Sequence, residues 1–136
     1  MDSNMDSSLL LEIRVACEEA LSVKGRQMSV VMIPFTGVSE GPYFFGKTLG
    51  TGVDTQKIGK DGSFRLSARY MLEGVDSAGN ACRVFIENQG NEAEGFCPWL
   101  VTDSPVLQQW EGKKLTATIG GTPQGVLVRI REAGEP

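Results

Sequence analysis

Apolar residues recur at every second position over most of the chain, in short segments separated by Gly-containing turns. This alternation is typical of antiparallel β-strands with one buried face. We predict strands at 9–17, 28–35, 43–49, 53–58, 63–72, 81–88, 96–101, 115–119 and 126–131. Residues 17–23, CEEALSV, fit either a turn of helix or a tenth strand at 20–24, and both alternatives stay open.

The connections favour hairpins between neighbouring strands. Glycines in GTG (50–52), GKDG (59–62), VDSAGN (75–80) and GGTPQG (120–125) supply the positive φ that tight turns need. One short helix is predicted near 104–110, where Asp103 or Ser104 can cap, Pro105 suits the first turn, and Leu107 and Trp110 can turn inward. So many strands in a short chain favour an all-β fold, a single closed or nearly closed antiparallel barrel of about 8–10 strands.

Length and charge narrow the classes of partner. A chain of 136 residues makes one domain, and we assign 9–131 to the barrel, 1–8 to a flexible N-terminal tail and 132–136 to a C-terminal tail. The net charge is −4 and no run of Lys or Arg forms a basic face, so we expect no nucleic-acid partner. The polar, acidic start and the absence of a long apolar run indicate a cytoplasmic protein without a membrane segment.

The inventory of reactive side chains is small. Three widely spaced cysteines, Cys17, Cys82 and Cys97, form no C-x-x-C pair, and we expect free thiols that are buried or partly buried. No His is present, which removes Ser-His-Asp and Cys-His catalysis and the usual zinc ligand sets. We therefore expect no metal and no cofactor, and proton transfer would depend on Asp, Glu, Tyr, Lys or Cys.

The segment GPYFFGKT, Gly41–Thr48, matches the phosphate-loop pattern G-x-x-x-x-G-K-[ST] letter for letter. A working phosphate loop needs a preceding strand, a flexible loop and a helix that begins at the Lys. Here the variable positions are bulky, and Gly50 and Gly52 follow too closely for a helix. We predict a strand interrupted by Gly46, and no nucleotide binding.

Polar residues cluster on one face of the predicted hairpin 63–88. A register that places Leu72 opposite Cys82 gathers the apolar residues on one face. The other face then carries Arg69 diagonal to Glu87, and Asp54, set opposite Ser67, falls diagonal to Arg69 as well. This face is either solvated or lines a barrel cavity, where the Arg would need its carboxylate partners and could hold an anionic or carbonyl ligand.

The same segments resemble a known family. Gly41-Pro42, Gly52-Val53-Asp54-Thr55-Gln56, Asp61-Gly62, Ala68-Arg69-Tyr70 and Asn88-Gln89-Gly90 are similar to the motifs of the domain of unknown function 3237 family. The resemblance covers most of the chain and extends to Thr102–Leu107 and the last strand. It implies a compact β-barrel, assembled as a homo-oligomer, with no agreed activity.

Three functions are compatible with these features. The leading hypothesis is a small-molecule-binding barrel with polar ligand contacts from Asp54, Gln56, Arg69, Tyr70, Glu87 and Trp99, and aromatic walls from Phe45, Phe85 and Trp99. The second is a cofactor-independent isomerase, cyclase or lyase in which Asp54 or Glu87 transfers a proton and Arg69 stabilises an oxyanion. The third is a structural or assembly module. For a homo-oligomer, we predict outward aromatic residues such as Tyr43 or Phe44 at the interface.

Overall fold

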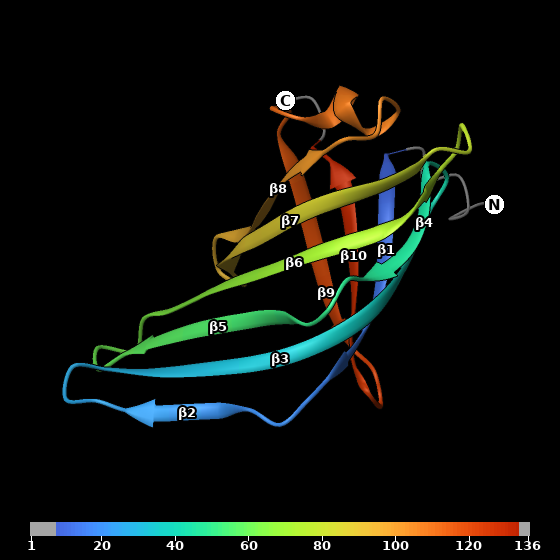
Figure 1. Cartoon of the computed structure of the whole chain (residues 1–136). Coiled ribbons are helices and arrows are strands. Elements are labelled where there is room, and N and C mark those ends of the chain that lie inside the picture. The colour runs from blue at the N-terminus through green and yellow to red at the C-terminus, as the bar shows by residue number, and fades with distance from the viewer. Residues whose placement is uncertain (1–7, 134–136) are drawn as a thin grey trace.

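The computed structural model describes residues 8–133 and is all-β (Figure 1). Its strands are β1 (Leu9–Cys17), β2 (Leu21–Lys24), β3 (Met28–Glu40), β4 (Phe44–Thr48), β5 (Gly52–Gly59), β6 (Phe64–Asp76), β7 (Ala81–Asn91), β8 (Gly95–Thr102), β9 (Leu115–Gly121) and β10 (Gly125–Glu132). Most of the two predicted tails, residues 1–7 and 134–136, lies outside the described residues. The strand at 20–24 is present, which decides against a helix there.

The strands close into an eight-stranded antiparallel barrel, as predicted. Around the wall the order is β1, β10, β9, β8, β7, β6, then β4 and β5, then β3, which pairs again with β1. β4 and β5 each pair with β3 and β6, so they occupy one position of the wall in series. The prediction that every strand pairs with its sequence neighbour is therefore wrong at GTG 50–52, which links two halves of one wall and does not form a hairpin.

β3 is longer than predicted because it serves two parts of the sheet. Its C-terminal part pairs with β1, and its N-terminal part pairs with β2 on one side and β5 on the other. Figure 1 shows β2, β3 and β5 extending to the left, beyond β1, β9 and β10. Within the described residues, β2 has β3 as its only paired neighbour.

One end of the barrel is closed by the segment after β8. It contains a short 3-10 helix, η2 (Leu107–Trp110), shorter than the predicted helix, with Leu107 and Trp110 buried as expected. The Ser104 hydroxyl accepts a hydrogen bond from the Leu107 N–H and donates one of 2.6 Å to Asp76. No helix among residues 8–133 is long and apolar enough to cross a membrane.

The inward faces of the strands form the core. Alternate residues of each strand point inward because the side-chain period of a strand is two. The most deeply buried side chains include Leu10, Leu11, Ile13, Leu72, Val84, Ile86, Leu107 and Ile130. This packing fills the end of the barrel near η2.

Gly41–Thr48 forms no phosphate loop. Its second half is strand β4, and a Cβ on Gly46 would lie 2.5 Å from the Glu73 carbonyl oxygen. The strand assignment is confirmed, and Gly46 is explained by the close approach of β6. The absence of nucleotide binding stays a prediction.

Candidate functional site

A cavity of about 200 Å³ lies inside the barrel, away from η2, between the strands β1, β3, β5, β6, β7, β9 and β10. Most of its wall is apolar, with Val15, Ile33, Phe35, Leu66, Ile119, Val126 and Val128 among the lining residues. Its polar lining residues are Asp54, Gln56, Tyr70 and Asn88, and Cys17 adds a thiol. The other end of the barrel is filled by core side chains, so this end holds the interior space.

The pairing register gathers the polar groups around one small residue. Asp54 lies opposite Ala68, and Ala68 lies opposite Asn88, so the three form one row across β5, β6 and β7. Tyr70 follows Ala68 at the next inward position of β6. Because Ala68 has only a methyl group, space remains between the longer side chains on either side. The row therefore frames a polar patch at the cavity wall.

The polar atoms of this patch lack partners. Among the described residues, four buried side-chain atoms have no hydrogen-bond partner, and three of them are Asp54 Oδ1, the Tyr70 hydroxyl and Asn88 Oδ1. Tyr70 is 6% exposed and Asn88 is 2% exposed. The second carboxylate oxygen of Asp54 accepts a 3.0 Å hydrogen bond from Gln56 Nε2. An unpartnered buried polar atom costs about 1–3 kcal/mol, so these three oxygens are free to accept hydrogen bonds within the cavity.

Burial shifts the pKa values of the three titratable groups in the cavity. The pKa of Asp54 is raised because burial disfavours its charged form, and the hydrogen bond from Gln56 opposes this only partly. Burial also raises the pKa of Tyr70. The pKa of the Cys17 thiol is raised by burial and by the negative charge of Asp54. No Lys or Arg lines the cavity to offset that charge.

Tight packing fixes the position of Tyr70. Its ring contacts Phe35 edge to face, with centroids 5.4 Å apart. Gly52 leaves room for both side chains, because a Cβ there would lie 2.6 Å from Phe35 Cζ and 2.7 Å from Tyr70 Cβ. In the segment Gly52-Val53-Asp54-Thr55-Gln56, the inward positions are 52, 54 and 56. Gly52 leaves space for Phe35 and Tyr70, Asp54 supplies a carboxylate, and Gln56 donates a hydrogen bond to that carboxylate.

The predicted cluster of Asp54, Arg69 and Glu87 does not form. Arg69 and Glu87 face each other in register and form a 3.0 Å ion pair, but on the outer surface, where 69% of the Arg69 side chain is exposed. Asp54 lies on the inner face of the same sheet. The predicted register set Asp54 opposite Ser67, whereas the structure pairs it with Ala68. A slip of one residue turns a side chain to the other face, which explains the error.

Glu87 is the centre of a separate outer-surface cluster. Its carboxylate accepts hydrogen bonds from Ser67 Oγ at 2.7 Å, Arg69 Nε at 3.0 Å and Trp99 Nε1 at 3.0 Å. The pKa of Glu87 is lowered, chiefly by the bond from Ser67, with smaller contributions from Arg69 and Trp99. These groups flank an open groove of about 620 Å³ on the outer face of β3, β5, β6 and β7.

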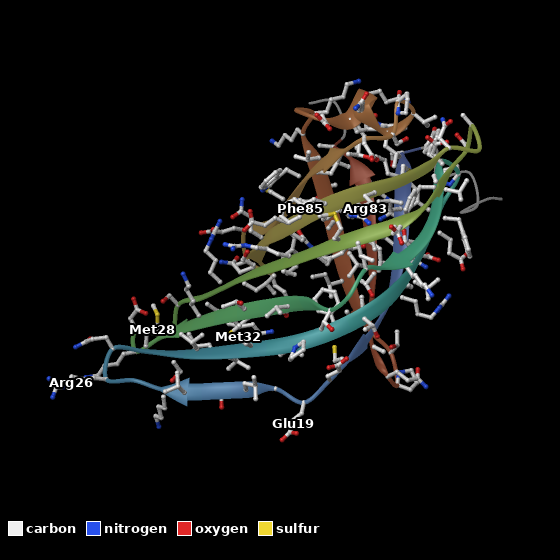
Figure 2. All side chains as sticks on the ribbon, in the orientation of Figure 1. Glu19, Arg26, Met28, Met32, Arg83 and Phe85 are labelled. Carbon is white, nitrogen blue, oxygen red and sulfur yellow. The ribbon has the colours of Figure 1, made fainter. Side chains whose placement is uncertain are left out.

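The predicted aromatic walls also face outward. Phe45 is 62% exposed and Trp99 is 41% exposed, and Phe85 packs against Trp99 with ring centroids 5.4 Å apart. Figure 2 shows Phe85 on β7, with Met28 and Met32 along β3. Conversely, Phe44 is buried and Tyr43 packs on Trp110, so neither is the outward interface residue that we predicted. Inward and outward residues alternate along the strands as predicted, but these aromatic side chains lie on the face opposite to the one predicted.

Six residues were predicted to contact a ligand in the cavity, and the structure places three of them in its lining: Asp54, Gln56 and Tyr70. Asn88 and Cys17 were missed. The three thiols are free as expected, but only Cys82 is buried, whereas Cys17 and Cys97 are exposed. A signal for Asn88 exists, because it continues the apolar series Cys82, Val84 and Ile86 at period two and interrupts it with an amide. Among residues 8–133, no three His, Cys, Asp or Glu side chains gather in a way that could hold a metal ion.

Comparison with known families identifies the chain. The sequence model of the family described as "Protein of unknown function (DUF3237)" matches residues 6–92. The chain belongs to this family. The matched range in this DUF3237 protein contains all four polar residues of the cavity. No curated protein matches the chain.

Solved structures share the fold of this DUF3237 protein. A protein with unknown function from Clostridium acetobutylicum has a TM-score of 0.77 at 21% identity, over 94% of this chain and 95% of that one. An enzyme from Penicillium herquei has a TM-score of 0.72 at 16% identity, over 92% of both chains. A beta-barrel like protein from Acinetobacter baumannii has a TM-score of 0.73 at 17% identity, over 92% of this chain and 93% of that one. At these identities the similarity establishes the fold alone.

Proposed function

We propose that this protein binds a small molecule in the interior cavity, with Asp54, Tyr70 and Asn88 as its polar contacts. The observation that carries the proposal is the convergence of three unpartnered buried oxygen atoms on one cavity. Folded proteins leave few buried polar atoms unpaired, because each costs about 1–3 kcal/mol. A ligand that supplies partners recovers this energy on binding.

The size of the cavity limits the ligand to about one ring. An apolar cavity of roughly 150 Å³ admits benzene, and drug-sized ligands need roughly 300 Å³ or more. The cavity here, about 200 Å³, suits a single ring or a short branched chain with one polar substituent. The mainly apolar lining favours a ligand with an apolar body.

Binding can be tested without knowing the natural ligand. Single-ring compounds with neutral, cationic and anionic substituents would be screened by saturation-transfer NMR against the wild-type protein. Ala68→Leu fills the space between Asp54 and Asn88 and should abolish the signals of the compounds that bind. Gln89→Leu adds an apolar side chain on the outer face of β7, at the edge of the outer groove, and should leave them unchanged.

The cavity thiol gives an independent measurement. Cys17 is solvent-exposed and also lines the cavity, so alkylation by iodoacetamide should slow when a compound binds. Cys97 is exposed on β8, opposite Gln89, and serves as the internal control. If no compound of the series protects Cys17 or gives a signal sensitive to Ala68→Leu, the binding proposal is wrong and the ligand-free assembly module is favoured.

A second candidate function is proton transfer by Asp54. A carboxyl whose pKa is raised by an apolar site is suited to general acid–base catalysis, and one solved structure of the same fold is described as an enzyme. This keeps the hypothesis of a cofactor-independent isomerase, cyclase or lyase, but without Arg69 and Glu87, which face outward. Tyr70, whose hydroxyl can donate a hydrogen bond, is the group that would contact a reacting oxygen.

The test follows exchange of α-protons of a small ketone. Acetophenone in D₂O with wild-type protein would be compared by NMR with Asp54→Asn and with Glu87→Gln, whose carboxylate lies on the outer face. Catalysis by Asp54 predicts accelerated exchange that is lost in Asp54→Asn and retained in Glu87→Gln. Equal exchange rates in wild type and Asp54→Asn would reject the role as a base, whether or not the ketone binds.

A further inference from the structure

The three unpartnered atoms of the cavity are all oxygens, and one of them belongs to a carboxylate. Asp54 and Asn88 lie one strand away from Ala68 on either side, so their backbones are separated by about two strand spacings, roughly 10 Å. Tyr70 extends from the next inward position of β6. Asp54, Tyr70 and Asn88 all line the same cavity as Ala68, the small residue between them in the register.

The charge of Asp54 has no counterion in the cavity. The lining residues on β1, β3, β5, β6, β7, β9 and β10 include no Lys or Arg. The other titratable lining groups are Cys17 and Tyr70, and both raised pKa values keep them uncharged at neutral pH. A carboxylate in an apolar site is costly unless a cation pairs with it. The protein does not supply that cation from the residues that line the cavity.

We propose that the ligand is a small primary amine with an apolar body, whose ammonium group binds above Ala68. This inference rests on the proposed function and names the ligand class of the same cavity. An ammonium group has three donors and no acceptor, which matches acceptance by Asp54 Oδ1, Asn88 Oδ1 and the Tyr70 hydroxyl oxygen. The apolar body would lie against Val15, Ile119 and Val126.

The same geometry ranks other ligand chemistries. A carboxylate or phosphate would meet the charge of Asp54 without a cation to offset the repulsion. An alcohol brings one donor and leaves the carboxylate without a charge partner. A quaternary ammonium carries charge but no N–H donor, so all three oxygens would remain unpaired. The predicted order of affinity is primary amine first, neutral isostere next and anion last.

Three compounds with the same ring test this order. Benzylamine, benzyl alcohol and benzoate would be titrated calorimetrically into the wild-type protein at pH 7. A charge-assisted hydrogen bond predicts that benzylamine binds about tenfold or more tightly than benzyl alcohol, with benzoate the weakest. Tetramethylammonium, with charge but no N–H, should bind no better than benzyl alcohol.

Two variants test whether the preference for the amine over the alcohol depends on Asp54. Asp54→Asn removes the charge and should bring the affinity ratio of amine to alcohol close to one. Glu87→Gln removes a carboxylate from the outer face of the same sheet and should leave the ratio unchanged. Lowering the pH through the range where Asp54 becomes protonated should weaken benzylamine binding in wild type and much less in Asp54→Asn.

The outcomes separate this inference from the binding proposal. Equal affinity for benzylamine and benzyl alcohol, or an amine preference that survives Asp54→Asn, overturns the amine assignment while binding at the cavity stands. Binding of none of the compounds, together with no protection of Cys17, overturns both. The wild-type series decides the first point on its own, so it does not depend on the folding of any variant.

Discussion

Replacing Tyr70 by phenylalanine removes one oxygen atom and keeps the ring that packs in the barrel. The side chain is 6% exposed, and its hydroxyl is buried without a hydrogen-bond partner. The ring contacts Phe35 at a centroid distance of 5.4 Å, and the Tyr70 Cβ lies against Gly52; neither contact involves the hydroxyl. The substitution therefore isolates the energy of one unsatisfied polar atom.

The expected effect is a gain in stability. Burying a hydroxyl without a partner costs about 1–3 kcal/mol, and phenylalanine removes that cost. The slightly larger cavity opposes the gain by roughly a few tenths of a kcal/mol, at about 24 cal/mol per Å³. We expect the variant to be more stable by about 1 kcal/mol, which for a chain of this length raises Tm by roughly 3–5 °C.

Urea denaturation and calorimetry of Tyr70→Phe would measure this gain in the absence of added ligand. Tyr43→Phe is the matched control, because Tyr43 is partly buried against Trp110, and its substitution should change the free energy of unfolding by no more than about 0.5 kcal/mol. A loss of about 1 kcal/mol or more in Tyr70→Phe would refute the reasoning, since it would show that the hydroxyl already has a partner. The same variant should bind benzylamine more weakly, so stability and affinity should change in opposite directions.

Four further predictions concern other parts of the molecule. Gly52→Ala should lower the free energy of unfolding, measured in urea, by about 1–3 kcal/mol, because its Cβ meets the Phe35 ring and the Tyr70 Cβ. Gly120→Ala, whose Cβ meets open space, is the control and should cause no such loss. Arg69→Lys and Arg69→Leu should each stay within about 0.5–1 kcal/mol of wild type, since the ion pair is exposed; a larger loss would contradict this. Because the pKa of Asp54 is raised above its ordinary 3.8, the charged carboxylate destabilises the folded state at pH values above the folded-state pKa, and this cost is absent below pH 3.8. In urea denaturation, the free energy of unfolding of Asp54→Asn should therefore exceed that of wild type by more at pH 7 than at pH 3.5. We propose that the protein self-associates through the apolar outer face near Trp99. Light scattering should give a multiple of the chain mass, and Trp99→Lys should lower that mass. A monomer at high micromolar concentration would refute this.

The fold was predictable from the sequence because its signal repeats in every segment. Period-two alternation and Gly-containing turns recur along the chain, so an error in one strand leaves the barrel assignment intact. The length of β3 and the serial arrangement of β4 and β5 were not predictable, because they depend on pairing between distant segments. The predicted register of β6 and β7, with Leu72 opposite Cys82, is wrong by two residues, since the structure pairs Leu72 with Val84. A shift of two residues keeps every side chain on its predicted face of the hairpin.

Whether Asp54 faces the barrel interior depends on the pairing register of β5 and β6, which the turn sequence did not determine. The GKDG connection allowed Asp54 opposite Ser67 or Ala68, and the two choices turn Asp54 to opposite faces. The first choice is attractive because it neutralises Asp54 with Arg69. The structure adopts the second and leaves the carboxylate without a cationic partner at the cavity wall, so the most favourable pairing of charges was a misleading guide to the register.

The alternation along β5 and β6 also has an evolutionary consequence. Asp54 and Gln56 are interleaved with Val53 and Thr55, so adjacent codons specify the cavity and the outer surface separately. The ladder that holds the wall together is made by backbone groups, which substitutions of either set leave in place. The cavity lining and the outer surface can therefore diverge independently while the barrel persists, and chains with only 16–21% identity retain the same fold.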